Sequence, residues 1–267
     1  MSQPSYIICS TVRSGSTLLA RTLSGLDGCG QPEESFHRHI IRQKQLNQSS
    51  KKFIDYCQAI VEASVRKDDA LGIKLHWWQL RDFLMLARQA ADSDTSLSDL
   101  AVLEQFFPNL KFVYLSREDR AAQAVSAAIA SQTGLWEKNV SIPAPTAKFQ
   151  PWKIYEWETA LTEQHQNWQT FFQQNSITPY QLTYEQLVSA FSQQISQIVE
   201  YLDLPVTPSP DDIDMPVQRQ ANANNQRLIK QYQQLPKPLS AASLWLYRQL
   251  KPSSQPTLTV SSPQEKA

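Results

Sequence analysis

The sequence is short of cysteine, of net charge and of long hydrophobic runs, and each shortage excludes a class of protein. Its 267 residues include 3 cysteines, Cys9, Cys29 and Cys57, which are too few and too scattered for a disulfide framework or a zinc site. This usage favours a reducing, cytoplasmic compartment. Lys plus Arg and Asp plus Glu both number 25, so the formal net charge is +0. A duplex-binding surface usually carries a basic excess, so nucleic acid is not the expected partner.

The apolar residues occur in short runs, which is typical of a globular core and not of a membrane span. No window approaches the ~20 apolar residues that a membrane span requires. The opening residues, MSQPSYIICS, have neither a basic start nor a long apolar run, so we expect no secretory signal there. Hydrophobic residues still make up 41% of the chain, which is enough to bury a sizeable core. We expect one domain over residues 1–250 and a disordered tail over residues 251–267.

Short apolar runs predict buried strands, and each run precedes a stretch with helical spacing. The expected strands cover residues 6–10, 71–75, 111–116 and 180–183. The expected helices cover residues 14–24, 78–91, 120–131, 152–174 and 185–202. Strands that alternate with helices predict an α/β fold with a mainly parallel sheet flanked by helices. Irregular connections are expected over residues 92–99, 139–151 and 205–216.

The strongest functional signal lies where the first expected strand runs into its helix. The sequence there is STVRSGST, ending at Thr17. Small residues allow the backbone to approach a ligand, and the N–H groups at a helix start point at an anion. The hydroxyls of Ser14, Ser16 and Thr17 add donors, and the guanidinium of Arg13 suits phosphate or sulfate oxygens. This loop predicts an anion site; the alternative is an ordinary helix start capped by Ser or Thr.

Two departures distinguish this loop from the P-loop of magnesium-dependent kinases. A Walker A motif requires two glycines and a Lys before its Ser or Thr, whereas Gly15 stands alone here and no Lys is present. The third expected strand runs into Arg117, so a cation stands where an ATPase would place a magnesium-binding Asp. Both departures favour an anion held without metal. The alternatives are a P-loop-like nucleotide kinase or phosphotransferase and a non-catalytic nucleotide-binding module.

A second anion site is predicted where the third strand meets its helix. Arg117 lies at the carboxyl end of the strand, which is the ligand side of an open α/β sheet. Asp119, Gln123 and Ser126 recur at i, i+4 and i+7, so they share one helix face. Alone they would indicate a solvated face with Asp119 as the helix cap. With Arg117 beside them, Gln123 and Ser126 become candidates for holding a second phosphate.

Four segments of the sequence, taken in their order along the chain, resemble the Stf0 family of PAPS-dependent sulfotransferases. They are VRSGSTLL from Val12, GQPEESF from Gly30, QAVS from Gln123 with QTGLW after it, and RQA from Arg219. The resemblance implies a P-loop-like PAPS sulfotransferase fold. It also implies an enzyme that moves a sulfuryl group from PAPS (3′-phosphoadenosine 5′-phosphosulfate) to a hydroxyl or amine, with PAP as the product. The acceptor would be a small polar molecule such as a sugar, a glycolipid headgroup or a secondary metabolite.

The resemblance also implies which residues hold the donor. The 5′-phosphosulfate would be cradled by the residues of the first loop: Arg13, Ser14, Gly15, Ser16 and Thr17. The rest of the nucleotide would be held by later residues: Arg117, Gln123, Ser126, Arg219 and Gln220. No metal ion is expected. Because the family includes dimers, a homodimer stays open.

The expected catalytic residues are Arg13, Lys74 and Glu34. Transfer requires a base for the acceptor proton, and the resemblance places that base at Glu34; Glu33 and His37 are the alternatives. Lys74 stands inside the second expected strand, where a Lys usually reaches a ligand or a partner. The alternative is a Lys at the strand end whose ammonium group extends to solvent.

Overall fold

The computed structural model describes residues 4–67, 69–90, 97–136, 147–206, 213 and 223–236, together with residues 241–242, 245–246 and 249. Several parts predicted from the sequence lie outside these ranges. They are Arg219, Gln220, the tail at 251–267 and most of the connections at 139–151 and 205–216.

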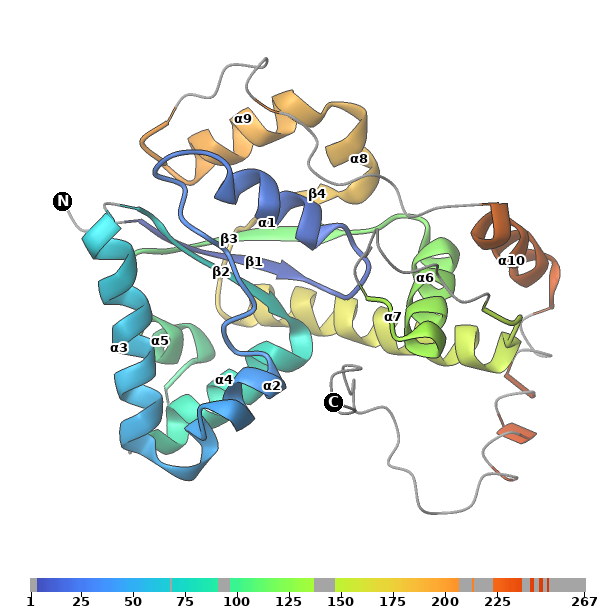
Figure 1. Cartoon of the computed structure of the whole chain (residues 1–267), viewed down its shortest axis with the longest axis horizontal. Coiled ribbons are helices and arrows are strands. Elements are labelled where there is room, and N and C mark those ends of the chain that lie inside the picture. The colour runs from blue at the N-terminus through green and yellow to red at the C-terminus, as the bar shows by residue number, and fades with distance from the viewer. Residues whose placement is uncertain are drawn as a thin grey trace. The chain divides into compact units, whose positions relative to one another are not determined.

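Parallel strands form a 4-stranded sheet in the order β2-β1-β3-β4 (Figure 1). They are β1 (Ser5–Ser10), β2 (Leu71–His76), β3 (Leu110–Ser116) and β4 (Tyr180–Thr183). Every pairing is parallel, so the carboxyl ends of the strands share one edge. The chain passes from β1 to β2 on one side and then crosses to β3 on the other. The ends of β1 and β3 therefore flank a topological switch point, where open α/β sheets bind ligands.

Helices cover both faces of the sheet, as the sequence predicted. On one face, β1 packs against a core cluster built from α1 (Ser16–Ser24), α8 (Tyr184–Ser189) and α9 (Phe191–Tyr201). On the other face, the core cluster is built from α3 (Ser50–Lys67), α4 (Trp77–Ala90), α5 (Asp99–Glu104) and α7 (Pro151–Gln174). Both faces of β1 are buried, which explains why its sequence is a continuous apolar run.

Some helices differ from the prediction. The expected helix at 185–202 is two helices, because Ala190 (φ −136, ψ 52) leaves the helical region between α8 and α9. The polar run at 92–99 is not all loop: Ser98 accepts a hydrogen bond from the Ala101 N–H and starts α5 at Asp99. The sequence analysis also missed the following helical segments: α2 (Arg38–Gln43), the short η1 (Leu46–Gln48), α3 and α10 (Ala223–Gln234).

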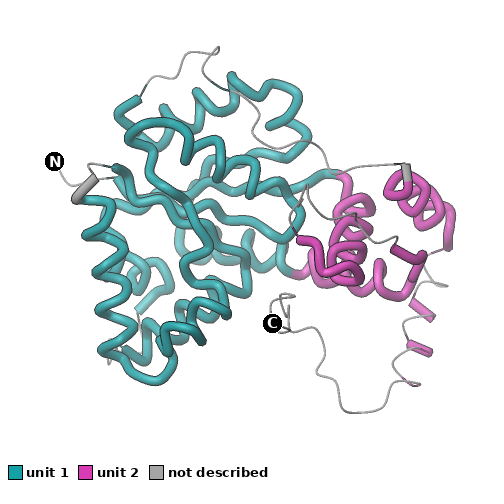
Figure 2. Tube along the Cα trace, viewed as in Figure 1, with its two compact units in different colours: residues 1–118, 164–217 teal, residues 119–163, 218–267 magenta. Residues whose placement is uncertain are grey.

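The chain divides into two compact units (Figure 2). The first comprises residues 1–118 and 164–217 and contains the whole sheet. The second comprises residues 119–163 and 218–267 and contains α6 (Arg120–Thr133), the start of α7 and α10. Inside the second unit, the Tyr232 hydroxyl donates to Glu158 at 2.7 Å, which ties α10 to α7. The single domain expected over residues 1–250 stays a prediction.

Candidate active site

The loop between β1 and α1 has a backbone that few sequences can adopt. Arg13 (φ 62) and Gly15 (φ 91) are both left-handed. Gly15 is the residue that precedes α1, so no side chain there can bond the first N–H groups of the helix. The alternative of a helix start capped by Ser or Thr is therefore wrong. The N–H groups at the start of α1 are oriented to bind an anion.

Ser14 lies inside this loop and is fully buried. Its Oγ has no hydrogen-bond partner among the residues that the structure describes. Leaving a buried hydroxyl unpaired costs ~1–3 kcal/mol. A ligand oxygen held by the N–H groups of the same loop would satisfy this hydroxyl, so the loop fits the anionic end of a nucleotide.

Arg117, just after β3, lies against the same loop. Its Nη1 donates to the backbone oxygen of Arg13 at 3.2 Å. Its guanidinium carbon stands 5.1 Å from the ring centroid of Tyr184, a residue that also borders Gly15. Its Nε is buried without a hydrogen bond and is 3.8 Å from an oxygen of Glu185. The two loops predicted to bind anions are thus neighbours at the switch point.

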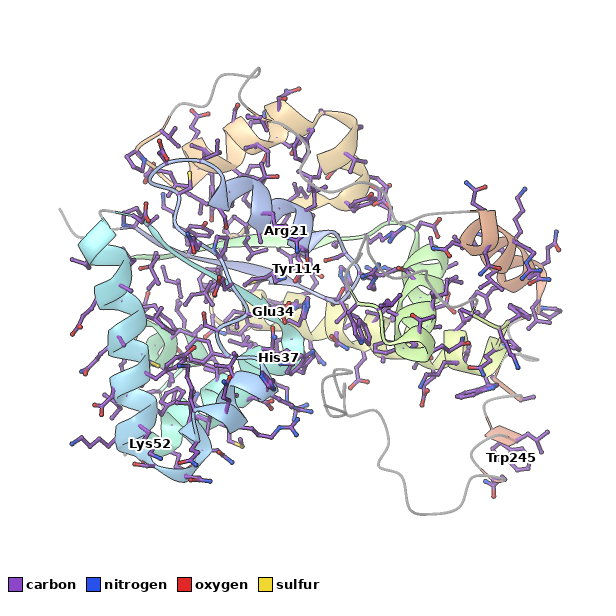
Figure 3. The ribbon with its side chains drawn as sticks, viewed as in Figure 1. Arg21, Glu34, His37, Lys52, Tyr114 and Trp245 are labelled. Atoms are coloured by element: carbon purple, nitrogen blue, oxygen red, sulfur yellow. The ribbon has the colours of Figure 1, made fainter. Side chains whose placement is uncertain are left out.

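Glu34 lies beside β2 (Figure 3). Lys74 joins it to the first turn of α1. Its Oε1 is 2.9 Å from the Nζ of Lys74, and the same Nζ donates to the Oγ1 of Thr17 at 3.3 Å. The other carboxylate oxygen accepts from the amide of Gln79 at 2.6 Å. One ammonium group therefore connects the expected base to the loop that is suited to an anion.

Lys74 is buried in the interior of β2, where it pairs in register with Ile8 of β1. Its side chain is only 7% exposed. The alternative of a strand-end Lys with its ammonium in solvent is therefore wrong. Because neighbouring residues in register point to the same face, Lys74 lies on the face that α1 covers, which explains how it reaches Thr17.

The backbone of Glu33 decides which of the two neighbouring carboxylates turns inward. Its carbonyl accepts from the Lys74 N–H at 2.9 Å, in an isolated bridge to Ile73 at the edge of β2. Consecutive residues of an extended segment point to opposite sides. Glu33 is exposed, whereas Glu34 points to Lys74.

His37, the third candidate base, serves as a helix cap. Its Nδ1 accepts from the His39 N–H at 3.1 Å at the start of α2. The ring packs edge-on against Trp78, with centroids 5.2 Å apart. Burial lowers the pKa of His37 below its usual 6.5, although Glu34 opposes this shift. One nitrogen of this ring is already engaged, and His37 stays an alternative base.

Burial acts on Glu34 and His76 in opposite directions, and the neighbours decide the result. Burial would raise the pKa of Glu34, but the charges of His76 and Lys74 and the hydrogen bonds from Lys74 and Gln79 lower it from 4.5 to about 2. For His76, burial outweighs the attraction of Glu34 and lowers the pKa from 6.5 to about 4. His76 is therefore uncharged at neutral pH, where Lys74 and Gln79 hold the charge of Glu34.

Gln79 and His76 are site residues that the sequence did not predict. Gln79 is fully buried, and its Oε1 accepts from the His76 N–H at 2.7 Å. The Nδ1 of His76 shares a hydrogen bond with the Oγ of Ser10 at 3.0 Å. The available signal was a Gln in the first turn of a helix that directly follows a buried strand, since a buried amide needs specific partners.

The other predicted donor-site residues belong to the second unit or fall outside the described residues. Gln123 and Ser126 are on α6, in the second unit, and Gln123 is fully buried, so a solvated face is wrong for this residue. Asp119 caps α6 by accepting from the Ala122 N–H at 2.8 Å. Arg219 and Gln220 fall outside the described residues.

Three further properties concern the described residues only. No group of three or more His, Cys, Asp or Glu side chains in them could hold a metal ion. None of their helices has the length and apolar character to cross a bilayer. All three cysteines, Cys9, Cys29 and Cys57, are buried and form no disulfide.

Comparison with known proteins identifies the class of this chain. A family model described as Stf0 sulphotransferase matches residues 5–234, from the start of β1 to the end of α10. The protein is therefore a sulfotransferase, a transferase of sulfuryl groups. It belongs to the Stf0 sulphotransferase family, which confirms the resemblance that the motifs indicated.

The individual proteins that resemble this chain share only a small part of its sequence. The chain is 22% identical over 256 residues to the trehalose 2-sulfotransferase of Mycolicibacterium smegmatis, covering 85% of this chain and 93% of that protein. A solved sulfotransferase domain from the curacin biosynthetic pathway has 16% identity and a TM-score of 0.47, covering 88% of this chain and 99% of the domain. A sulfotransferase from Alicyclobacillus acidocaldarius has 14% identity and a TM-score of 0.46, covering 95% and 98%.

Proposed function

We propose that this sulfotransferase takes its sulfuryl group from PAPS and transfers it to a hydroxyl or amine of a small polar acceptor. One observation carries the proposal: the Lys74 ammonium is 2.9 Å from the Glu34 carboxylate and 3.3 Å from the Thr17 hydroxyl. A proton acceptor and a helix start suited to an anion thus lie within reach of one side chain. The family supplies the reaction class.

The chain offers separate groups for the two anionic ends of PAPS. The N–H groups at the start of α1, the Ser14 hydroxyl and Arg13 would hold the 5′-phosphosulfate. This helix start has no side-chain cap, and the buried Ser14 hydroxyl has no partner among the described residues. Arg117 would hold the 3′-phosphate from the neighbouring strand end. Gln123, Ser126, Arg219 and Gln220 stay predicted contributors.

In the proposed transfer, Glu34 takes the acceptor proton while the acceptor oxygen or nitrogen bonds to sulfur and the bond from sulfur to the 5′-phosphate oxygen breaks. Bound PAPS supplies the activated sulfuryl group as a mixed anhydride. Lys74 and the N–H groups of α1 stabilise the negative charge that grows on the departing phosphate oxygen. A well-placed base contributes typically ~10²–10⁴-fold to the rate.

A named relative and the family resemblance suggest which acceptors to test. The curated relative acts on trehalose, which makes a sugar hydroxyl the first acceptor to test. That relative is only 22% identical to this chain, which is too distant to assign the same acceptor. We therefore extend the panel to glycolipid headgroups and polar secondary metabolites. A cytoplasmic location and a homodimer stay predictions.

Thermal-shift titration of the full chain with PAP, ATP plus magnesium and free sulfate tests the donor. A ligand at 100 times its Kd stabilises the folded protein by ~2.7 kcal/mol. We expect PAP to raise the melting temperature, and Arg117→Ala to reduce that shift. Lys111→Ala is the matched control, because Lys111 is a cation on β3, the strand that Arg117 follows, and it pairs with Asp203 instead.

Two outcomes would contradict the proposal. Stabilisation by ATP plus magnesium but not by PAP would favour a nucleotide phosphotransferase. Binding of PAP without transfer from labelled PAPS to any member of a broad acceptor panel would favour a non-catalytic nucleotide-binding module.

A further inference from the structure

Side chains of the protein itself engage both carboxylate oxygens of Glu34. Lys74 Nζ is 2.9 Å from Oε1, and Gln79 Nε2 is 2.6 Å from Oε2. The Gln79 amide cannot flip without losing a second hydrogen bond, because its own oxygen accepts from the His76 N–H at 2.7 Å. Hydrogen bonds and a cation that favour the charged form weaken a carboxylate as a base. In this arrangement Glu34 is poorly prepared to take a proton.

The Lys74 ammonium group also has a second partner, at the start of α1. This group carries three donors, one of which reaches the Thr17 hydroxyl at 3.3 Å in the first turn of α1. This turn is where the anionic end of the donor binds in the proposed function. The Lys74 side chain is only 7% exposed, so its charge requires a partner inside the protein. Sulfuryl and phosphate oxygens at α1 would therefore compete with Glu34 for this cation.

We propose that Lys74 makes the activity of the base conditional on the donor. Before PAPS binds, Lys74 pairs with Glu34. When PAPS binds, Lys74 turns to the oxygens at the start of α1, and Glu34 is freed to accept the proton of the acceptor. The inference rests on the proposed function and adds to it an order of events: the donor prepares the base before the acceptor is deprotonated.

This exchange of partners by Lys74 predicts a change in the protonation of Glu34, which can be measured without knowing the acceptor. The groups that face Glu34 are Lys74 and His76 of β2, Gln79 of α4 and His37 at the start of α2. Against burial, which raises the pKa of Glu34, the charges of His76 and Lys74 and the hydrogen bonds from Lys74 and Gln79 hold it at about 2. Withdrawing Lys74 removes its charge and its hydrogen bond together, so the pKa of Glu34 should rise. If that pKa returns at least to its ordinary 4.5, binding at about pH 5 adds at least about 0.2 proton per donor.

The test is isothermal titration of PAPS into the full chain at about pH 5, in acetate and in piperazine. The dependence of the heat on buffer ionisation gives the protons taken up on binding. We expect the wild type to take up more protons than Glu34→Gln, which has no carboxylate to titrate. In a Lys74→Met background Glu34 is already released, so adding Glu34→Gln should change the uptake much less. Lys111→Met should behave as the wild type does.

The outcomes separate this inference from the proposed function. If PAPS binds and the wild type and Glu34→Gln take up equal numbers of protons, the exchange is wrong while the donor assignment stands. If PAPS does not bind to the wild type, both are wrong. Should Lys74→Met fail to fold or to bind PAPS, the comparison of the wild type with Glu34→Gln still decides.

Discussion

Two neighbouring glutamates of this site have very different surroundings. Glu33 and Glu34 are adjacent, identical in chemistry and preceded by Pro32, yet one is exposed and the other meets a buried cation. A backbone hydrogen bond from the Lys74 N–H to the Glu33 carbonyl aligns this segment with β2. Because consecutive residues of an extended segment face opposite sides, only one of the two carboxylates faces Lys74.

We predict that Glu34→Gln abolishes turnover, with a loss of ~10²–10⁴-fold, and leaves the affinity for PAP nearly unchanged. The amide keeps the shape of the carboxylate but cannot take a proton. Transfer from labelled PAPS and a PAP binding isotherm measure the two effects. Glu33→Gln is the matched control and should retain activity. Full activity in Glu34→Gln, or loss of activity in Glu33→Gln, would remove Glu34 as the base.

Gln79 is predicted to be a positioning residue for Glu34. Gln79→Leu removes the donor to Glu34 and leaves the buried His76 N–H unpaired, which costs ~1–3 kcal/mol of stability. With an acceptor found on the panel, we expect kcat to fall roughly tenfold or more while the KM for PAPS stays unchanged. Gln89→Leu, an exposed Gln on the same helix, is the control. An unchanged kcat in a folded Gln79→Leu protein would contradict this role.

The secondary-structure elements were predicted unevenly, for physical reasons. All four strands were found because burial on both faces gives continuous apolar runs, as in β1. The break at Ala190 was missed because neither Gly nor Pro marks it. Helix α3 was missed although Phe53 and Cys57 bury one of its faces, since polar residues separate them.

The candidate site could be predicted only in part. The loop at 10–17 is a local motif, so its residue types were enough to indicate an anion site. The contacts among Glu34, Lys74 and Gln79 depend on how the segment at Glu33 aligns with β2, and this alignment is a tertiary property. The resemblance to the family supplied Glu34, and residue types alone left Glu33 and His37 open.

The start of α1 should not tolerate a side chain at Gly15. Its φ of 91 is left-handed, and an added Cβ would lie 2.5 Å from the Tyr184 ring. We expect Gly15→Ala to lose ~1–2 kcal/mol or more of stability and to weaken PAP binding, because the loop must shift. Urea denaturation and PAP titration measure these effects.

Gly25→Ala is the matched control at the other end of α1. Its φ is −86, and the nearest atom to an added Cβ is 3.4 Å away. We expect it to bind PAP as the wild type does. Wild-type PAP affinity in Gly15→Ala would show that the shape of the loop does not matter for the donor.

At the scale of the whole molecule, positive and negative charge are balanced. Lys plus Arg and Asp plus Glu are each 25, so no overall field draws an anionic substrate to the protein. In the proposed function, attraction of the donor would therefore arise locally, from Arg13, Lys74 and Arg117 around the switch point. The first unit contains all three residues.

Stability should fall in mildly acidic solution because of His76. Its pKa is lowered by burial from 6.5 to about 4, so between these values the unfolded chain binds a proton that the folded protein does not. Stability is therefore fully present above pH 6.5 and is lost as the pH falls toward 4, by up to ~3 kcal/mol.

Urea denaturation at a series of pH values measures this dependence. We expect His76→Gln to flatten the decline between pH 6.5 and 4, and the exposed His39→Gln to leave it unchanged. The same decline in His76→Gln as in the wild type would mean that other groups cause it.

The central claim is that the loop after β1 and Arg117 after β3 hold the two ends of one adenosine bisphosphate. A crystal structure of the protein with PAP tests it most directly. We predict the 5′-phosphate within hydrogen-bond distance of the Ser14 hydroxyl and the first N–H groups of α1, with the 3′-phosphate at the Arg117 guanidinium. A nucleotide bound elsewhere, or one that leaves Ser14 and Arg117 without contact, would contradict the account.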